Sequence, residues 1–544
     1  MIVARNRSRM LVLLKVETDT TLSVPEIGKR TDWQVGQTVV AIGKTFDAEQ
    51  PNLSVGILSA LDRVWGKAIQ TDAKISPANY GGPLIDLHGR HLGVLVPLSP
   101  DSDGELAGAE WYDSGIGFAV PLEDIMRQLP RWSTGEDLQP GKLGVSLKDP
   151  EDLDPEPVVG VVKLKSPAAE AGIRAGDRIV SVDGRATDRL SQMRHALTPR
   201  YAGDQVALVI RRDDEELNLN VTLVAKVPPY EHPFLGIIPD RQTGSDKAMV
   251  EFCYPDSPAE LAGLKPGDQI THWNEQAIDS VAALRLAIAN VEPGATVTVA
   301  WQREAEPISA QVKLAALPRA ILATAPTHKD GEERPDFEVG ELEVSVPEVP
   351  HAYKAYVPAS MQKGHVPGLV VVLPPPGEGK SDDLIAAWKP VCEARDLVLL
   401  VAKPADDNRW TSREVDTVRK FIDQAKTRFG IDEQRIGLVG DGAGGAMAYL
   451  LTIRNRELIR GLAIRDAASP VPIEAFENEP LTRLAFLFLT HASLDNNSDM
   501  EKEMNELVAA KFPVTQRSLE DDSHKLVASD IEAIGLWLDC LDRL

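Results

Sequence analysis

The sequence has 544 residues, of which 43% are hydrophobic and 26% charged, with 58 basic residues against 82 acidic ones. This length exceeds what one hydrophobic core usually supports, so we expect three or four domains. The formal net charge of −24, dispersed along the chain, argues against a nucleic-acid or anionic-membrane surface. The three cysteines are too far apart for a disulfide framework or a zinc site, and we expect them to be buried; no metal and no cofactor is predicted.

Residues 1–130 contain short apolar runs separated by turn-forming glycines, which predicts strands. The segments VVAIG (39–43) and HLGVLVPL (91–98) have the length of buried strands. The first apolar run, LVLLKV (11–16), is too short for a signal-peptide core, and the chain has no run of about 18 apolar residues. We therefore predict neither a signal peptide nor a membrane span, and interpret this run as a strand entered in the middle of a fold.

An internal repeat of about 92 residues follows a boundary rich in turn-forming residues, STGEDLQPGK (133–142). The first copy combines LGVSL with SPAAEAGIRAGDRIV, and the second combines LGIIP with SPAELAGLKPGDQI. Each copy then continues through a short strand, a helix-like segment and a final strand pair. A repeat of this length predicts two small domains rather than the units of a solenoid.

The last 200 residues, which follow a polar linker at 318–340, have a different pattern. Four apolar runs of strand length (GLVVVL, LVLLVA, RIGLVG and LAFLFLT) alternate with amphipathic stretches. The clearest such stretches are EVDTVRKFIDQAKTRF (414–429) and DIEAIGLWLDCLDRL (530–544). This alternation predicts a parallel sheet flanked by helices.

The stretch SPANYGGP (76–83) resembles the G-N-S-G-G-P loop that carries the nucleophile of chymotrypsin-fold serine proteases. The surrounding segments RNRSRMLVLLKVE, VGQTVVAIGK, VGILSAL, IQTDAKISP and GIGFAVP resemble, in this order, the HtrA (Deg) family of trypsin-fold proteases. The resemblance implies an all-β, trypsin-like barrel over residues 1–130 that is incomplete at its N-terminus.

The residues that carry protease chemistry are replaced in this resemblance. A serine protease needs a serine nucleophile, a histidine base and an orienting aspartate. Tyr80 stands at the serine position, Met10 at the aspartate position, and Ala78 where an oxyanion-loop glycine is expected; the first histidine of the sequence is His88. Because a phenol titrates at about pH 10 and is bulky, we predict that this protease site is inactive.

The two repeats resemble PDZ domains of the HtrA kind, with expected bounds of 141–226 and 233–316. Such a domain adds a peptide as an extra strand, and its loop amides receive the terminal carboxylate. The resemblance assigns this role to two four-residue loops: Leu143, Gly144, Val145 and Ser146, and Leu235, Gly236, Ile237 and Ile238. The alternative is that these domains only pack against their neighbours.

The segment RIGLVGDGAGGAMAYLL (435–451) resembles the nucleophile elbow of α/β hydrolases, a strand, a sharp turn and a helix. With the upstream run YKAYVPASMQKGHVPGLVVVLPPPGEG, it resembles esterases of the feruloyl-esterase and polyhydroxybutyrate-depolymerase type. The resemblance implies an α/β-hydrolase-like domain at 340–544, with Gly442 at the nucleophile position and Asp495 and His524 as the remaining acid and base.

Three alternatives remain for this segment. Asp441 would serve as nucleophile if the elbow were shifted by one residue, although this places Val439 where a small residue is needed. Residues 440–445 also fit a G-x-G-x-x-G phosphate loop, although they follow a late strand rather than the first one. His524 is equally well explained as a surface residue of a charged loop.

The sequence thus predicts a multidomain protein: a partial trypsin-like barrel, two PDZ-like α+β domains and an α/β-hydrolase-like domain. We expect a catalytically inactive relative of the HtrA proteases that binds polypeptide C-termini or unfolded segments as a scaffold or adaptor, and that regulates an active relative. The family resemblance implies the cell envelope or periplasm. The competing hypotheses are a serine endopeptidase or esterase-like hydrolase with an unrecognised nucleophile, and a nucleotide or acyl-ligand binder with a pocket formed by Asp441, Asp495 and His524.

Overall fold

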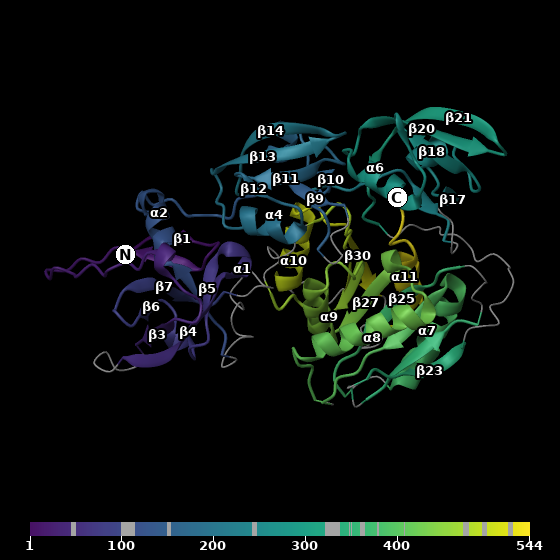
Figure 1. Cartoon of the computed structure of the whole chain (residues 1–544). Helices are drawn as coiled ribbons and strands as arrows, with labels where there is room; N and C mark the ends of the chain where they lie inside the picture. Colours follow the sequence, from purple (N-terminus) through teal and green to yellow (C-terminus); the bar gives the residue numbers. More distant parts are fainter. Residues whose placement is uncertain are drawn as a thin grey trace. The chain divides into compact units, whose positions relative to one another are not determined.

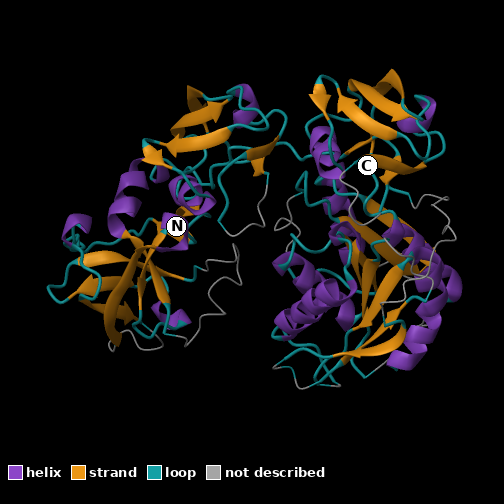
Figure 2. Cartoon of the chain, turned by 45° about the vertical axis from the view of Figure 1, so that its right-hand side comes forward, coloured by secondary structure: helices purple, strands orange, loops and turns teal. Residues whose placement is uncertain are grey.

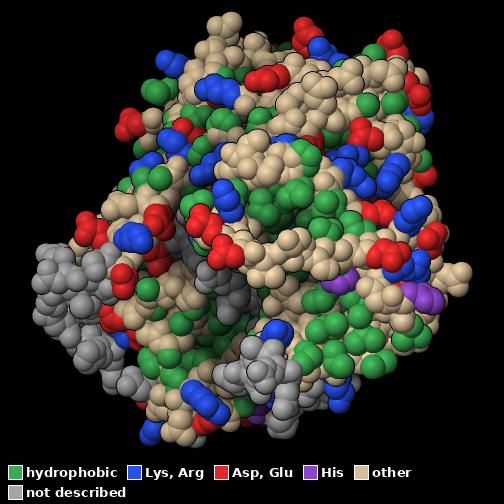
Figure 3. Space-filling view, turned by 90° about the vertical axis from the view of Figure 1, so that its left-hand side faces the viewer, with side chains coloured by type: hydrophobic (Ala, Val, Ile, Leu, Met, Phe, Trp, Pro, Cys, Tyr) green, Lys and Arg blue, Asp and Glu red, His purple; other side chains and the backbone are tan. Residues whose placement is uncertain are grey.

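The computed structural model describes the chain except for the following residues: 45–50, 99–114, 149–153, 242–246, 321–337, 348, 350, 360–364, 378–379, 407, 472–477, 492–497 and 520–525. The chain forms two compact units, Met1–Pro228 and Pro229–Leu544 (Figure 1). Acidic and basic side chains are interspersed over the face seen in Figure 3, as their dispersal in the sequence predicts.

The first unit begins with a hairpin and a closed barrel. The hairpin pairs β1 (Ile2–Asn6) with β2 (Leu11–Leu14). Six antiparallel strands close the barrel in the order β3-β4-β5-β8-β7-β6. Their bounds are β3 Thr38–Gly43, β4 Asn52–Asp62, β5 Ala68–Thr71, β6 Pro83–Asp86, β7 His91–Val96 and β8 Gly117–Pro121.

Buried and partly exposed residues alternate along β3, and the buried ones fill the interior of the barrel. Val39 and Ala41 are fully buried in the barrel core, while the alternate residues Thr38, Val40 and Ile42 are partly exposed. Successive side chains of a strand point to opposite faces, so one face of TVVAIG packs inward. Helix α1 (Arg63–Gly66) lies between β4 and β5, and α2 (Leu122–Trp132) follows β8.

The first repeat folds into a four-stranded sheet of order β12-β11-β13-β14 and a separate pair, β9 with β10. Its elements are β9 Val145–Leu147, β10 Val159–Val162, α3 Pro167–Glu170, β11 Arg178–Val182, β12 Arg185–Ala186, α4 Leu190–Leu197, β13 Gln205–Arg212 and β14 Glu215–Thr222. Asp213 and Asp214, both with positive φ, form the two-residue turn between β13 and β14. Such turns match the right-handed twist of antiparallel strands.

The second repeat forms a sheet with strands β16-β17-β18-β20-β21 in order, with β19 added beside β18. Its elements are β15 Pro233–Phe234, β16 Ile237–Pro239, β17 Ala248–Cys253, α5 Pro258–Leu261, β18 Gln269–Trp273, β19 Gln276–Ala277, α6 Val281–Ala289, β20 Thr296–Arg303, β21 Glu306–Lys313 and β22 Ala315–Ala316. Glu304 and Ala305, again with positive φ, repeat the tight turn of the first copy. The two repeats therefore share one small α+β fold.

The C-terminal part contains an eight-stranded sheet of order β23-β24-β26-β25-β27-β28-β29-β30. β24 is antiparallel to both of its neighbours, and the remaining neighbours are parallel. The strand bounds are β23 Gly340–Val344, β24 Tyr353–Val357, β25 Gly368–Leu373, β26 Leu397–Val401, β27 Ile436–Asp441, β28 Gly461–Arg465, β29 Ala485–His491 and β30 Val514–Leu519.

Helices cover both faces of this sheet (Figure 2), which is why its inner strands β25 and β26 are continuously apolar. In β25, Val371 packs in a cluster with Phe421, and Val370 packs in another with Trp388 and Trp537. The helices are α7 Ser381–Arg395, α8 Glu414–Phe429, α9 Ala443–Arg454, α10 Ser498–Ala509 and α11 Ala528–Asp539.

Helix α8 shows how the sequence sets its bounds. Glu414 and Asp416 lie in its first turn and Lys426 and Arg428 in its last, which complements the helix dipole. Gly430 follows with φ of 62°, a left-handed conformation that ends many helices. Among the described helices, none has the length and apolar character needed to cross a bilayer.

The predicted fold class is confirmed: a β-barrel, two PDZ domains, and a mostly parallel sheet with helices. One detail of the sequence interpretation is wrong. The amphipathic pattern at 530–544 extends to the last residue, whereas α11 ends at Asp539 and the last five residues are not helical. Cys392 and Cys540 are buried as expected, but Cys253 is only partly buried.

Candidate functional site

The loop that contains Tyr80 is a tight turn held by its own side chains. Asn79 is buried, and its Oδ1 accepts hydrogen bonds from the Ser76 backbone N–H at 3.0 Å and from Ser76 Oγ at 3.1 Å. The backbone N–H of Gly81 donates to Leu95 O on β7 at 2.9 Å, which fixes the loop to the barrel. The loop is therefore a well-defined part of the barrel.

The structure places Tyr80 and Met10 in different surroundings. Tyr80 is half-buried, and burial raises the pKa of its phenol above the ordinary value, so the hydroxyl stays protonated. Met10 lies in the turn between β1 and β2 with φ of 53°, and packs in a cluster with Val64 and Phe118. The described members of that cluster include neither Tyr80 nor Ala78.

The first PDZ loop requires a glycine at its centre. Gly144 has φ of 85°, and a Cβ atom at this position would lie 2.3 Å from Ser166 Cβ. The Gly144 carbonyl accepts hydrogen bonds from Lys163 N at 2.8 Å and Ser166 Oγ at 3.3 Å. Ala168 N also donates to Leu143 O at 3.0 Å. These bonds fix the loop carbonyls and determine where the loop amides point.

The second PDZ loop has the same construction. Gly236 has φ of 96°, and its carbonyl accepts hydrogen bonds from Tyr254 N at 2.9 Å and Ser257 Oγ at 3.3 Å. Ala259 N donates to Leu235 O at 2.8 Å, as Ala168 N does to Leu143 O. The two repeats therefore share a loop geometry as well as a fold.

The two loops differ in what their amides contact. In the second domain, the backbone N–H groups of Gly236 and Ile237 donate to the backbone oxygen of Leu544, at 2.7 and 3.1 Å. In the first domain, no residue of the described part of the chain accepts a hydrogen bond from the N–H of Gly144, the counterpart of Gly236. The sequence reasoning did not identify Leu544; the signal was a hydrophobic residue at the end of the sequence.

The fourth residue of each predicted loop lies on the strand that follows. Ser146 lies on β9 opposite Val161 of β10. Ile238 lies on β16 and packs with Phe234 and Cys540, whereas its neighbour Ile237 faces the core of the PDZ domain. Because side chains alternate along a strand, only one of these two isoleucines, Ile237, shares a cluster with Leu544.

The segment predicted as an elbow is a sharp strand-to-helix turn. Strand β27 ends at Asp441, Gly442 has φ of 51° and ψ of −121°, and α9 begins at Ala443. A Cβ atom on Gly444 would lie 2.0 Å from Leu373 O, and one on Gly440 would lie 2.5 Å from Gly445 Cα. The turn thus leaves no room for side chains on its flanking glycines.

Asp441 is the partner of an arginine on the next strand. Arg465 lies opposite Asp441 in the parallel register of β27 and β28, and its Nε donates to Asp441 Oδ1 at 2.8 Å. A second bond joins Arg465 Nη2 to Asp441 Oδ2. Asp495 and His524, the other predicted residues of this domain, lie outside the described residues.

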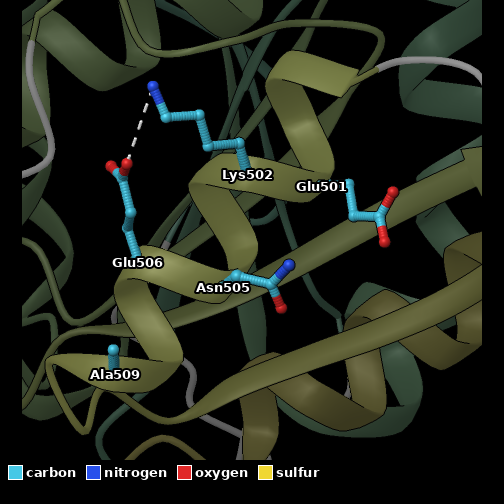
Figure 4. A pocket seen from close by; sticks show the side chains of 5 residues that line it. All are labelled: Glu501, Lys502, Asn505, Glu506 and Ala509. Carbon is cyan, nitrogen blue, oxygen red and sulfur yellow. Dashed lines mark ion pairs between the residues drawn. The ribbon is translucent and has the colours of Figure 1, made fainter.

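A hollow of about 480 Å³ lies beside α10 (Figure 4). It is lined by Glu501, Lys502, Asn505, Glu506 and Ala509, all from this one helix. Lys502 Nζ lies 3.9 Å from Glu506 Oε1, an i,i+4 pair of the kind common on exposed helices. No predicted site residue lines this hollow, and we assign it no function.

Comparison with known domain families supports the two recognised regions. The PDZ domain family matches residues 141–223 and 233–314, and the trypsin-like peptidase domain family matches residues 1–94. Among solved structures, the serine endoprotease of Yersinia pestis is 23% identical, with 42% of this chain and 75% of that chain covered and a TM-score of 0.31. An HtrA-type protease, AlgW with tripeptide, is 27% identical with a TM-score of 0.32 and covers 42% of this chain and 77% of its own.

Two curated relatives are named as probable periplasmic DegP-like serine endoproteases. That of Pseudomonas fluorescens is 31% identical over 306 residues, and that of Hahella chejuensis is 30% identical over 342 residues. The alignments cover 50% and 56% of this chain, and 62% and 70% of the two relatives. On this identity and coverage, together with the matches to both domain families, the chain belongs to the HtrA/DegP family of trypsin-like peptidases with PDZ domains.

Proposed function

We propose that this protein recognises the C-terminal ends of polypeptides, or unfolded segments, through its PDZ domains and acts as a scaffold or adaptor. One observation carries the proposal: in the second PDZ domain, two loop amides converge on the backbone oxygen of Leu544, as they would on the carboxylate of a bound peptide. Capture of a terminal carboxylate by backbone amides is a general mode of peptide recognition. The first domain has the same loop, with Gly144 held in the same way.

Tyr80 supports the second part of the proposal, that the barrel does not cleave peptides. A serine protease attacks with a hydroxyl whose proton a histidine accepts. Burial raises the pKa of Tyr80 further from neutrality, and a phenol in place of a serine fills space that the scissile carbonyl needs. An adaptor of this kind would act on, or together with, an active relative of the same family.

For residues 340–544 we propose an α/β-hydrolase-like domain without a nucleophile. The sharp turn at Gly442, with positive φ and crowded flanking glycines, supports an elbow whose tip has no side chain. Asp441 is an unsuitable substitute, because the Arg465 guanidinium holds both of its oxygens. Since the curated relatives are named periplasmic, we also propose the cell envelope as the location.

Peptide recognition is tested by measuring hydrogen exchange of the full chain with C-terminal peptides added. We expect peptides with a free terminal carboxylate to slow amide exchange at residues 143–145, and the same peptides with an amidated end to have little effect. Equal protection by both forms, or protection of neither, would contradict the proposal for the first domain.

The absence of catalysis is tested with a fluorophosphonate probe and a casein cleavage assay. We expect no labelling and no cleavage by the natural chain, because Tyr80 is not an activated nucleophile. A variant with both Tyr80→Ser and Met10→Asp serves as a comparison. Labelling of the natural chain would overturn this part of the proposal, and mapping the labelled residue would identify the domain responsible.

A further inference from the structure

We infer that the second PDZ domain is occupied in cis by residues 540–544 of the same chain, with Leu544 in the position of the ligand. This inference rests on the proposed function, since it treats the groove as a site for chain ends. Figure 1 shows the C-terminus beside α6, within the second PDZ domain. Both partners belong to the unit Pro229–Leu544.

The backbone of Leu544 makes the contacts of a bound peptide end. Its backbone oxygen accepts hydrogen bonds from Gly236 N at 2.7 Å and Ile237 N at 3.1 Å, and its own N–H donates to Ile237 O at 2.9 Å. The last contact pairs Leu544 with the strand β16, as an added strand pairs with a sheet edge. Three hydrogen bonds therefore fix the position and direction of this residue.

The side chain of Leu544 fills an apolar pocket. Leu544 is 1% exposed and packs in the core cluster that contains Leu235 and Ile237 from the loop and Leu284 and Ile288 from α6. A loop and a helix thus enclose the last side chain from two sides. The ligand class that this pocket selects is a chain end with an aliphatic last residue and a free carboxylate.

An arginine next to the groove holds the residues before Leu544. Arg241 follows β16 and donates from Nε to Asp542 Oδ2 at 2.8 Å and from Nη2 to Asp542 Oδ1 at 2.7 Å. Its Nη1 also donates to Asp539 Oδ1 at 2.8 Å. Burial alone would raise the pKa of Asp542, but the charge of Arg241 and its hydrogen bonds hold this pKa below the ordinary value. The tail is therefore bound by a bidentate ion pair as well as by the groove.

The tail also starts from a fixed point. Helix α11 packs on the C-terminal sheet through Ile534, Trp537 and Leu538, and ends at Asp539. Only residues 540–543 separate this end from Leu544 in the groove, so little chain entropy is lost when Leu544 binds. A ligand held in this way has an effective concentration on the order of millimolar or higher, which disfavours binding of a second chain end from solution.

The two PDZ domains thus have different roles. The second binds residues 540–544 of its own molecule, whereas the amide of Gly144 in the first, the counterpart of Gly236, has no acceptor among the described residues. The first groove is the one available to external chain ends.

The test compares the 544-residue chain with a variant extended by Gly-Ser-Gly after Leu544, which keeps the leucine but removes its free carboxylate. The probe is a peptide with the sequence of residues 539–544, with serine in place of cysteine, in free-acid and amidated forms. Amide exchange at Gly236 and Ile237 is measured by mass spectrometry. We expect exchange at these amides to be at least about tenfold faster in the extended variant.

The free-acid peptide is expected to restore slow exchange in the extended variant and to bind the natural chain at least about tenfold more weakly at this site. The amidated peptide is the matched control and should restore little of the slow exchange. Unchanged exchange after extension, or equal rescue by both peptides, would overturn the inference. Should the extension unfold the second domain, rescue by the free acid but not by the amide would still support it, and rescue by neither would count against it.

These readouts separate this inference from the proposed function. Protection at residues 143–145 by external peptides reports on the first groove and does not depend on the tail. Loss of that protection contradicts peptide recognition by the first domain, whereas unchanged exchange at Gly236 and Ile237 contradicts only occupation in cis.

Discussion

His232 is buried in the second unit as a neutral imidazole. Its Nε2 lies 2.9 Å from Asn478 Oδ1, and the Asn478 amide donates to Tyr230 O and Lys511 O, both at 2.8 Å. Burial lowers the pKa of His232 to about 3, and the positive charge of Arg483 acts in the same direction. A neutral imidazole that donates to an amide oxygen satisfies this site without charge.

This histidine makes the second unit less stable in acid. Between pH 6.5 and about pH 3, the unfolded chain binds a proton at His232 that the folded chain does not, so the free energy of unfolding decreases as the pH falls. We expect a contribution of about 1 kcal/mol between pH 7.5 and 5.5. Urea unfolding, followed by hydrogen exchange within residues 229–544, measures it.

The comparison must be made against His232→Gln, because Glu503 acts in the opposite sense. Burial raises the pKa of Glu503 to about 7, so acidification below pH 7 stabilises the folded state through this residue. The difference between the natural chain and the variant cancels this contribution. A difference that stays constant from pH 7.5 to 5.5 would contradict the assignment to His232.

At the scale of single elements, two glycines of the C-terminal domain have different functions. Gly430 ends α8 with φ of 62°, and a Cβ atom there would meet nothing within 4 Å. Gly444, in the first turn of α9, would place a Cβ atom 2.0 Å from Leu373 O. The first glycine serves only the backbone conformation, while the second allows α9 to approach β25.

We therefore expect Gly430→Ala to reduce the free energy of unfolding by about 1–2 kcal/mol, the cost of a left-handed alanine. Gly444→Ala should cost about 3 kcal/mol or more, because the backbone carbonyl of Leu373 cannot move aside as a side chain can. The urea midpoints of the two variants measure these two losses of stability. Equal costs would show that the contact at Leu373 O relaxes without penalty.

Most helices and strands could be predicted from the hydrophobic periodicity of the sequence alone. GLVVVL and RIGLVG lie in β25 and β27, and EVDTVRKFIDQAKTRF is α8, because runs of these lengths have few alternative structures. The ion pair of Asp441 with Arg465 could not be predicted, since it depends on which strand lies beside β27. Asp495 and His524 remain predictions.

The end of α11 shows a second limit of sequence reasoning. The amphipathic pattern continues past Asp539, but the residues after it contact a domain that lies about 300 positions earlier in the chain. Asp542 and Leu544 contact Arg241 and Gly236, which are distant in the sequence. The pattern of residues 540–544 therefore does not indicate these contacts. The PDZ loops themselves were predictable because the same sequence pattern occurs in both copies of the repeat.

At the scale of the whole molecule, Arg241 joins the second PDZ domain to the C-terminal domain. Its side chain is 8% exposed and contacts two buried carboxylates, Asp539 and Asp542. Arg435 Nη2 also donates to Asp539 Oδ1 at 2.8 Å. We expect Arg241→Met to destabilise the second unit by about 3–5 kcal/mol, since Asp542 would lose its bidentate partner while remaining buried.

The matched control is Arg211→Met. Arg211 forms an exposed ion pair with Glu216 on the hairpin of the first PDZ domain. Exposed pairs of this kind contribute little to stability, so its urea midpoint should not change measurably. A similar loss in both variants would show that the buried cluster has no special role.

The position of Leu544 makes the binding valency of this protein depend on one side chain. A charged residue at position 544 would not suit the apolar pocket that Leu544 fills, and would release the second groove. The molecule would change from one available groove to two, and partners with two chain ends would then bind by avidity rather than singly. Exchange of one residue would thus alter what the protein can assemble without altering its fold elsewhere.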